Sequence, residues 1–496
     1  MKSSPPDTLQ SPSPVDKTIP AKQAAVPVEP AAKAQTPVSP QVARRILISL
    51  MFPAILMPLV SSMSNIALPI IRDDFQIQAD MTAWVATVFT LPFMILMPVY
   101  GRLSDGVGKR RLILAGVTIF STGTAITLVA PGLAWLMVGR AIQGIGAAGM
   151  MPLGMAFISA IFSRRERGKA LGTWSSVGPT VAFIGPLAAG FLVDRWGWRA
   201  AFAPALVVSI VAYLVVRRWV PAGLSNVRPR FLQTFDWTGA LLLAGTLTML
   251  LFYLASRPIT GVASLRDWRL LLVTFILGSA FFWWEQRQRD PFVSFGIFRN
   301  KLFSLGSFCA SMRMFTMGGL GFLMPLYLVD VRGLSPAYIG LLAMVNPGAM
   351  SLMVRFGGAI ADRWGSRWPA IIGLSVQGST MVIFHLLPDT VSLWVVAGVL
   401  AYYGLGAGFV LAALHRAAIG HISDEQMGSA AGLYSMLRFA GAVIGTALAG
   451  VILQIFLDQA LPALNAYQNT FLFFAGTALV GAGLSFWLKE AKRSYQ

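Results

Sequence analysis

Long apolar runs recur along almost the whole chain. Most of them reach about 20 residues, the length at which a helix crosses the hydrocarbon core of a bilayer, and short segments with Pro, Gly or charged residues separate them. Backbone polar groups inside a bilayer must be satisfied within the chain, which leaves helices and closed barrels, and runs this long favour helices. Of the 496 residues, 56% are hydrophobic and only 12% are charged, which argues against a soluble domain. The sequence therefore predicts an all-α integral membrane protein.

The runs predict fourteen transmembrane helices. The expected spans are 46–71, 81–101, 112–131, 133–162, 170–192, 200–220, 236–255, 269–284, 302–329, 336–357, 368–387, 391–415, 427–456 and 469–488. Residues 1–43 contain nine prolines and no aromatic residue, so they predict a disordered cytoplasmic tail. Residues 489–496 form a second short tail.

Charge is distributed unevenly. The net charge is +19, with 39 basic and 20 acidic residues, and most Lys and Arg fall on one side of the expected membrane. This is the positive-inside pattern, which places both termini in the cytoplasm and requires no nucleic-acid partner. Cys309 is the single cysteine, so an intramolecular disulfide is excluded.

A ten-residue polar segment occurs twice between apolar runs, as GRLSDGVGKR at 101–110 and GAIADRWGSR at 358–367. A repeated Gly-x-x-x-Asp-x-x-Gly-basic loop between membrane helices resembles the signature loop of the major facilitator superfamily. The copies follow the second and the tenth expected helix. Two additional helices must then separate two six-helix halves, and this 6 + 2 + 6 plan is similar to the fourteen-helix drug:proton antiporter branch of the superfamily.

Further segments carry the same resemblance in the expected order: NIALP at 65–69, RAIQG at 140–144, GPLAAG at 185–190, FDWTGA at 235–240 and FRNKLF at 298–303. The resemblance divides the chain into a tail (1–43), an N-terminal six-helix bundle (44–220), two linking helices (221–300), a C-terminal six-helix bundle (301–488) and a tail (489–496).

The resemblance implies a multidrug exporter-like transporter of the cell inner (cytoplasmic) membrane. Such a protein exports an amphiphilic or anionic small molecule by alternating access, with proton antiport as the coupling implied by the branch, and with a periplasmic adaptor protein as a further possible partner. Two alternatives stay open: uptake or facilitated transport of an organic anion without proton antiport, and a membrane partner or sensor that transports nothing.

We expect no enzymatic activity, cofactor or metal. The segment GIGAAG at 144–149 matches the dinucleotide-binding pattern, but it lies inside an expected membrane helix with no preceding strand. Small residues at this spacing instead let membrane helices approach closely.

The repeated loops imply a conformational latch on the cytoplasmic side. Gly101 and Gly108 would allow a tight backbone turn, and Asp105 would bind a helix N-terminus or a basic residue across the half interface. The alternative is a solvated basic turn that only sets topology. The first copy has Gly106 where the family usually has Arg, whereas the second keeps Arg363. The expected gating residues are Gly101, Asp105, Gly108, Lys109, Arg110, Gly358, Asp362, Arg363 and Gly365.

Two Gly-Pro pairs, at 178–179 and 185–186, predict two breaks in the fifth expected helix. Gly185, Pro186 and Gly190 match the motif that the family associates with antiporters, where a bend is thought to seal the path against ion leak. The alternative is simple packing of small residues.

The most informative chemical feature is a set of arginines inside the expected helices with no carboxylate there to pair with them. Arg313 and Arg438 each lie about eleven residues into an expected helix, which is about 16 Å deep. A central arginine costs about 2.5–3.5 kcal/mol on insertion scales, so each should face a watery cavity or a partner. No acidic residue falls in the middle third of an expected helix, and Val60 occupies the position where the branch usually carries an Asp. The sequence therefore predicts a net positive cavity that favours an anionic substrate.

Other polar side chains on the expected helices are further candidates, although each could equally form an interhelical hydrogen bond that braces the bundle. The expected substrate or coupling residues are Arg313, Arg140, Arg438, Asn65, Gln143, Asn346 and Tyr434. Residual proton carriers are His415, Asp330 and Asp73 with Asp74, of which His415 is expected at the cytoplasmic edge.

Overall fold

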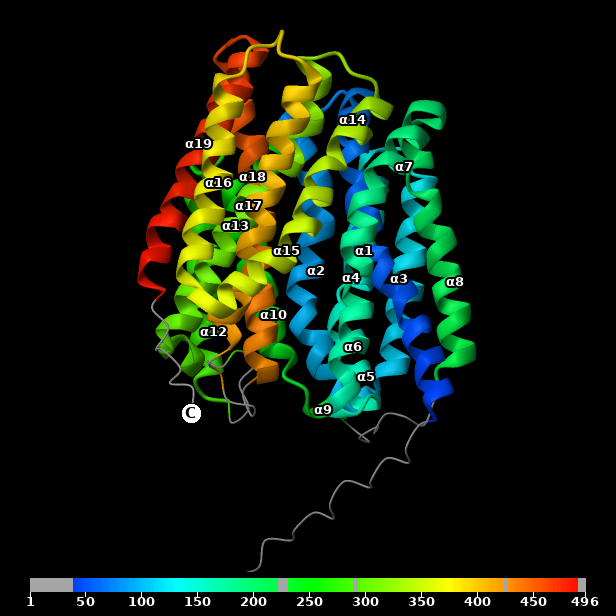
Figure 1. Cartoon of the computed structure of the whole chain (residues 1–496). Coiled ribbons are helices and arrows are strands. Elements are labelled where there is room, and N and C mark those ends of the chain that lie inside the picture. The colour runs from blue at the N-terminus through cyan, green and yellow to red at the C-terminus, as the bar shows by residue number, and fades with distance from the viewer. Residues whose placement is uncertain are drawn as a thin grey trace, which may run out of the picture. The chain divides into compact units, whose positions relative to one another are not determined.

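In the computed structural model, residues 39–221, 231–288, 293, 295–420, 422 and 427–488 are described, with backbone only for residues 105, 164, 165, 234 and 427–429. Within these ranges every regular element is a helix (Figure 1). The helices are α1 (Pro40–Phe75), α2 (Ala79–Val107), α3 (Lys109–Leu128), α4 (Leu133–Ala147), α5 (Met150–Ile161), α6 (Arg164–Ser175), α7 (Val177–Ala200), α8 (Ala203–Trp219), α9 (Phe231–Thr234), α10 (Trp237–Leu254), α11 (Arg257–Thr260), α12 (Trp268–Glu285), η2 (Phe295–Arg299), α13 (Lys301–Asp330), α14 (Pro336–Ala343), α15 (Val345–Trp364), α16 (Arg367–Leu386), α17 (Leu393–Ile419), α18 (Met427–Asp458), α19 (Ala463–Leu484) and η3 (Ser485–Trp487).

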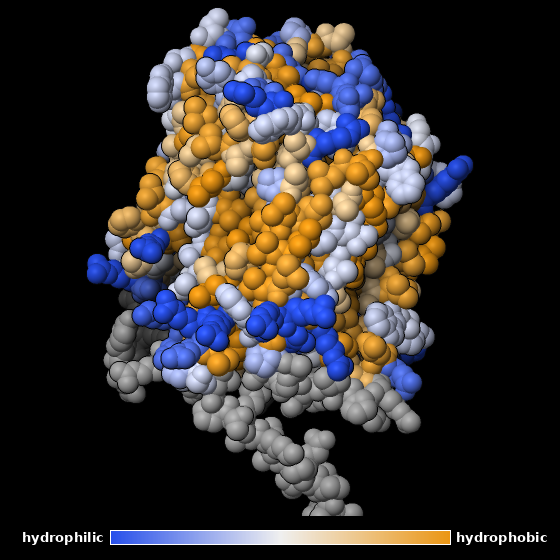
Figure 2. All heavy atoms as spheres, turned by 90° about the vertical axis from the view of Figure 1, so that its right-hand side faces the viewer, coloured by the Kyte–Doolittle hydropathy of each residue, from blue (hydrophilic) through white to orange (hydrophobic). Residues whose placement is uncertain are grey.

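In the described part of the chain, twelve helical segments are long and apolar enough to cross a membrane. Several combine two consecutive helices, as α4 and α5 do in Leu133–Ile161. The expected spans 200–220 and 269–284 are also helical, as α8 and α12, but neither is among the twelve. A multi-pass helical membrane protein is therefore confirmed, whereas the count of fourteen stays a prediction. Figure 2 shows a hydrophobic band between hydrophilic ends on one face.

The N-terminal boundary differs from the expected one. α1 begins at Pro40, directly after Ser39, whose side chain accepts a hydrogen bond from the Val42 backbone N–H. Proline at the first helical position and serine as N-cap are both favourable, because they meet the geometry of the first turn. Residues 40–43 are therefore helical with Ser39 as their cap, while residues 1–38 and 489–496 lie outside the described residues.

The Gly-Pro pairs do not break the fifth helix as predicted. α7 continues through Pro186, and the interruption lies earlier, at Ser176 between α6 and α7. Pro179 falls in the first turn of α7, where a missing N–H leaves no intrahelical bond unmade. The predicted pair of breaks was therefore wrong, and one junction lies upstream of both.

The expected polar loops are also mostly helical. α2 runs to Val107 and α15 runs to Trp364, so Gly101 and Gly358 lie within helices. Each helix ends at a glycine with positive φ, +96° at Gly108 and +77° at Gly365, a conformation that side chains with a Cβ rarely adopt. The tight turn was correctly placed on Gly108, but Gly101 takes no part in it.

The glycine-rich segment at 144–149 lies at the junction of α4 and α5, and no strand occurs among the described residues. A Cβ on Gly144 would lie 2.1 Å from the carbonyl oxygen of Phe89, and one on Gly146 would lie 2.4 Å from the backbone nitrogen of Phe120. These glycines therefore allow α4 to approach α2 and α3 closely.

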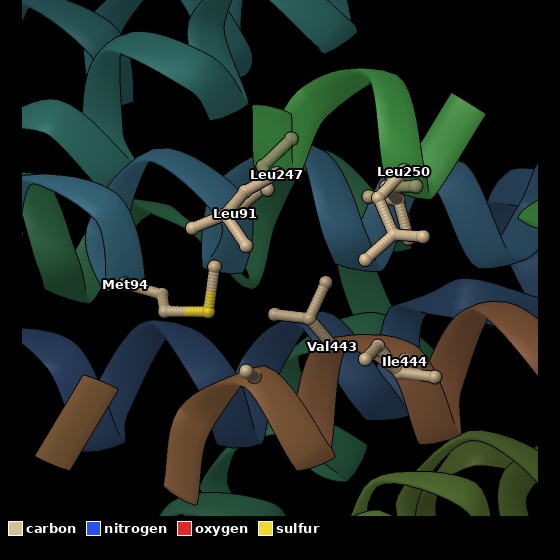
Figure 3. A pocket seen from close by; sticks show the side chains of 8 residues that line it. Leu91, Met94, Leu247, Leu250, Val443 and Ile444 are labelled. Carbon is tan, nitrogen blue, oxygen red and sulfur yellow. The ribbon is translucent and has the colours of Figure 1, made fainter. Parts of the chain in front are cut away.

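Helix contacts form two groups. In the first, α1 packs on α7 and α8, and α4 packs on α2 and α3; in the second, α13 packs on α17, α18 and α19, and α17 packs on α15 and α16. The groups meet through α2 with α18, α7 with α14, and α1 with α13. α10 lies on α12 and also touches both α2 and α18. Where these three helices meet, a small cavity is lined only by apolar side chains, with Leu91, Leu247 and Val443 among them (Figure 3). α10 therefore covers the seam between α2 and α18 with apolar packing.

Candidate functional site

Arg313 lies in α13 and is only 2% exposed. Its Nε donates to the carbonyl oxygen of Ala407 at 3.0 Å, while Nη1 and Nη2 face the sulfur atoms of Met314 and Met350 at 3.5 and 3.6 Å. A guanidinium has five N–H donors, and thioether sulfur is a weak acceptor. Among the described residues, one carbonyl is therefore the only strong acceptor that the Arg313 side chain contacts, and the group retains donors for an anionic partner.

Close helix packing brings Met350 and Ala407 to this arginine. A Cβ on Gly408 of α17 would lie 2.4 Å from the carbonyl oxygen of Met350 in α15, and one on Gly404 would lie 2.3 Å from the carbonyl oxygen of Asn346. Glycines thus let the two backbones touch, as small residues do in membrane bundles. Asn346 is half-buried, and its backbone carbonyl lies on this contact between α15 and α17.

Arg438 of α18 forms the second cationic group. Its Nη1 lies 3.3 Å from Nε2 of His415, and its guanidinium lies over the ring of Phe439 at 5.0 Å. The rings of His415 and Tyr434 meet edge-on at 5.1 Å. The Nε of Arg438 and the hydroxyl of the buried Tyr434 have no hydrogen-bond partner among the described residues, so both are polar groups that a ligand could satisfy.

The two arginines belong to one positive region, because Arg313 and Arg438 are close enough to interact electrostatically, and His415 interacts with both. Across the described residues the ion pairs involve Asp73, Asp74, Asp330, Asp362 and Asp458, all near helix ends. None of them neutralises the cationic cluster of Arg313, Arg438 and His415. An anion is the chemical partner that this cluster fits.

Arg140 is placed differently. It is 1% exposed, donates from Nη1 to the side-chain oxygen of Gln143 at 3.1 Å, and lies over the ring of Phe89 at 4.6 Å. Gln143 in turn donates to Thr124 Oγ1 at 3.0 Å. This network joins α2, α3 and α4 within one group of helices. Its geometry favours the bracing role for Arg140 and Gln143.

Asn65 lies where the two groups of helices meet. It is half-buried in α1, and its Nδ2 would lie 3.4 Å from a Cβ on Gly321 of α13. Val60, one and a half turns earlier on α1, is fully buried. The position that usually carries the helix-1 Asp is therefore packed with apolar atoms.

An ion pair joins the end of α1 to the end of α13. Arg72 donates from Nη1 and Nη2 to the two oxygens of Asp330, both at 2.6 Å, and the Tyr467 hydroxyl donates to Asp330 at 2.5 Å. A bidentate arginine–carboxylate pair is among the stronger polar contacts, because both donors align with both oxygens. Asp330 thus connects α1, α13 and α19 in this conformation.

The helix-5 motif contributes a second contact between the two groups of helices. A Cβ on Gly190 of α7 would lie 2.5 Å from the carbonyl oxygen of Pro336, and one on Gly340 of α14 would lie 2.3 Å from the carbonyl oxygen of Pro186. A Cβ on Gly185 would lie 2.9 Å from the side chain of Ser62. The motif therefore makes backbone-to-backbone contact with the second group of helices.

The repeated cytoplasmic segments bind within their own groups of helices. Arg110 donates to the carbonyl oxygen of Arg217 at the end of α8 at 2.8 Å, and Asp362 accepts from Arg416 of α17 at 2.8 Å. The side chain of Asp105 lies outside the described residues. The expected latch across the half interface is thus not seen for Asp362, whose partner is on the same side of that interface.

Gly106 has a specific packing role. A Cβ at this position would lie 1.9 Å from the ring of Phe231, the first residue of α9. The usual family Arg could not occupy this site without displacing that ring. Exposed Arg363, at the other copy, lies with Trp364, Trp368 and Ile372 around a surface hollow of about 420 Å³.

Sequence reasoning missed part of the cluster. His415 was expected as a residual proton carrier near the end of its helix, but its contact with Arg438 was not predicted. Met314 and Met350 were not expected to contact an arginine at all. For Met314 the only signal was that it adjoins Arg313 in the chain. For Met350 there was no signal, because nothing in the sequence placed α15 beside Arg313.

The family profile of the Major Facilitator Superfamily matches residues 50–446, and a second match covers residues 303–496. The multidrug resistance protein Stp of Mycobacterium tuberculosis (strain CDC 1551 / Oshkosh) is 29% identical over 400 residues, which are 80% of this chain and 73% of that protein. The riboflavin transporter RibZ of Clostridioides difficile (strain 630) is 25% identical over 86% of this chain and 90% of its own length. The tetracenomycin C resistance and export protein of Streptomyces glaucescens is 26% identical over 86% of this chain and 79% of its own.

Solved structures share the fold. A peptide transporter POT in complex with sulfate superposes with a TM-score of 0.67 at 16% identity, covering 90% of this chain and 96% of that one. A bacterial homologue of the human lysosomal transporter Spinster, in an inward-facing and unoccupied conformation, superposes with a TM-score of 0.64 at 16% identity, covering 91% and 98%.

Proposed function

Because the chain belongs to the Major Facilitator Superfamily, we propose that it exports an amphiphilic, anionic small molecule from the cytoplasm by alternating access. It is a membrane transporter and not an enzyme. The export direction is supported by relatives whose names record multidrug resistance and tetracenomycin C export. The anionic preference rests on one observation: Arg313 is buried in α13 with a single strong acceptor and no carboxylate partner among the described residues.

Two six-helix bundles would move about the cationic cluster, α1–α8 as the N-terminal bundle and α13–α19 as the C-terminal one. α10 and α12 would then be the linking pair of a 6 + 2 + 6 plan with fourteen spans. The length of α8 supports this count. Its 17 residues extend about 26 Å, and Arg217 and Arg218 lie in its last turn. An even number of spans places both termini on one side, and the basic cytoplasmic segments support an inner membrane with both termini inside.

Alternating access needs contacts that close one side and can separate. Arg72 with Asp330, and Gly190 with Gly340, would close the outer side while substrate enters from the cytoplasm. The repeated segments 101–110 and 358–367 would latch the cytoplasmic side in the opposite state. In that state Asp105 and Asp362 would find partners across the half interface, as the family resemblance implies.

Uptake or facilitated transport of an organic anion is the second candidate. Val60 fills the usual helix-1 Asp position with buried apolar atoms, and no described Asp or Glu lies in the middle third of a helix. Proton antiport by a central carboxylate therefore has no residue to carry it among the described residues. The coupling between proton movement and substrate movement therefore has to be measured directly.

Purified protein in proteoliposomes tests the proposal with two probes of the same ring and opposite charge, naphthalene-2-sulfonate and 2-naphthyltrimethylammonium. We expect protein-dependent flux of the sulfonate to exceed that of the ammonium, and to fall in Arg313→Ala. Equal flux of both probes would contradict the anionic preference. An imposed pH gradient, with and without an ionophore, then separates antiport from uncoupled movement.

A further inference from the structure

His415 is the one membrane-helix histidine that joins the cationic cluster. Among the described residues the only other histidine is His385, in α16, whose ring nitrogen lies 3.0 Å from the carbonyl oxygen of Gln468. His415 lies four residues before the end of α17. Its Nε2 lies 3.3 Å from Arg438 Nη1 and its ring meets Tyr434 at 5.1 Å. The imidazole is therefore part of the proposed anion site.

The contact with Arg438 defines the protonation state of this conformation. A guanidinium nitrogen can only donate, so Nε2 of His415 must accept and carries no proton there. An imidazolium in the same place would add a third positive charge beside Arg438 and Arg313. No described carboxylate is available to balance that charge.

The groups that face the imidazole come from two helices. α18 presents Arg438 and Tyr434, and α13 presents Arg313. α15 also packs on α17, but its carboxylate at Asp362 binds Arg416 instead. From α16, Arg367 stacks on Trp368 and Phe486. Among the described residues, the charged and titratable groups that interact with the ring are therefore two cations and a phenol.

We propose that His415 takes up a proton when an anionic group binds Arg313 and Arg438, and releases it when the anion leaves. This inference rests on the proposed function. The anion occupies the N–H donors of Arg438, which frees Nε2, and its negative charge stabilises the imidazolium. A proton from water on the open side of the transporter adds to Nε2, and no bond of the substrate breaks. When the anion departs, the two guanidinium groups again favour the neutral ring.

A direction of coupling follows from this linkage. Anion and proton bind together, so they cross in the same direction, and a monoanion moves with no net charge. This is opposite in sign to proton antiport, in which proton and substrate exclude each other. Export would then carry one proton out of the cytoplasm with each anion, so an inward proton gradient would oppose it and the substrate's own outward gradient would have to drive it.

Proton uptake on binding is the decisive measurement. Naphthalene-2-sulfonate remains an anion throughout the neutral pH range, so any proton taken up belongs to the protein. Calorimetric titration of the full-length protein in buffers of different ionisation heat gives the number of protons per anion bound. We expect about one in the wild type, because a single imidazole is linked, and about none in His415→Gln, whose amide oxygen can still accept from Arg438. His385→Gln is the matched control and should behave as the wild type.

The pH dependence of sulfonate affinity gives a second readout, which does not depend on calorimetric heats. Sulfonate affinity should rise as pH falls through the titration of His415, by at most about tenfold per pH unit for one linked proton, and this rise should be absent in His415→Gln. His415→Asn repeats the test if the glutamine variant does not fold. Sulfonate binding to the wild type without proton uptake would overturn the inference and leave the anion site standing. Absence of sulfonate binding to the wild type would overturn the anion site and this inference together.

Discussion

Arg72 at the end of α1 and Asp330 at the end of α13 form a bidentate ion pair, with both donor–acceptor distances at 2.6 Å. The two residues lie 258 positions apart in the chain. Their side chains are 18% and 20% exposed, so water screens the pair only partly. The contact joins α1 of the first group of helices to α13 of the second, which makes it a candidate lock between the two groups.

Arg72→Gln should weaken this lock and increase the outward-open population by about five- to thirtyfold, since a hydrogen bond to a charged group contributes about 1.5–3 kcal/mol, with part lost to solvent screening. Spin labels would be placed at Val129 and Trp394, which are 78% and 87% exposed, in a Cys309→Ser background. The distance between the two labels would report how far the two groups of helices separate. The charge swap of Arg72→Asp with Asp330→Arg should restore the wild-type distribution. An unchanged distance distribution in Arg72→Gln would show that the pair does not control the gate.

Arg313→Ala should reduce sulfonate transport with little loss of folded protein. A charge-assisted contact to substrate is worth about 1.5–3 kcal/mol, so KM should rise by about tenfold to a hundredfold. Arg140→Ala is the comparison, because it leaves the buried side-chain oxygen of Gln143 without its donor and should lower the yield and thermal stability instead. Loss of folding in Arg313→Ala, with transport per folded molecule preserved, would assign Arg313 the bracing role.

Gly190→Ala should slow turnover. Its Cβ would lie 2.5 Å from the carbonyl oxygen of Pro336, so α7 and α14 must separate before the outer side can close. Gly178→Ala on the same helix is a matched control, since no atom lies within 4 Å of the added Cβ. The comparison of initial transport rates at equal amounts of folded protein is the measurement. Equal slowing in both variants would point to helix bending and away from the interhelical contact.

Gly106→Arg restores the usual family residue and should be destabilising here. The Phe231 ring occupies the space of the new side chain, and overpacking of this kind costs about 1–3 kcal/mol. Detergent-solubilised protein should therefore unfold at a lower temperature, and Phe231→Ala should recover part of that loss. Gly101→Ala, with no atom within 4 Å of its Cβ, should leave the unfolding temperature unchanged. A stable Gly106→Arg variant would mean that α9 can move away from α2 at no cost.

Hydropathy was enough to locate the helices, because a helix that crosses lipid must satisfy its own backbone and present apolar side chains along its length. Hydropathy was less informative about where each helix ends. The segments 101–110 and 358–367 are polar, yet they are helical up to a single glycine, since polar residues outside the hydrocarbon region can still continue a helix. The interruptions inside the spans, at residues 148–149, at Ser176 and at Met344, were not predicted at these positions.

The amino-acid sequence by itself determined the class of protein, the buried arginines and the absence of a central carboxylate, because each of these depends on composition along one helix. Tertiary structure decided which groups meet. It placed Arg140 in a satisfied network with Gln143, left Arg313 facing two methionine sulfurs, and turned His415 toward Arg438. Such pairings depend on how far glycines let neighbouring helices approach and on which face each helix presents. That geometry arises between segments distant in the chain, where hydropathy carries no information.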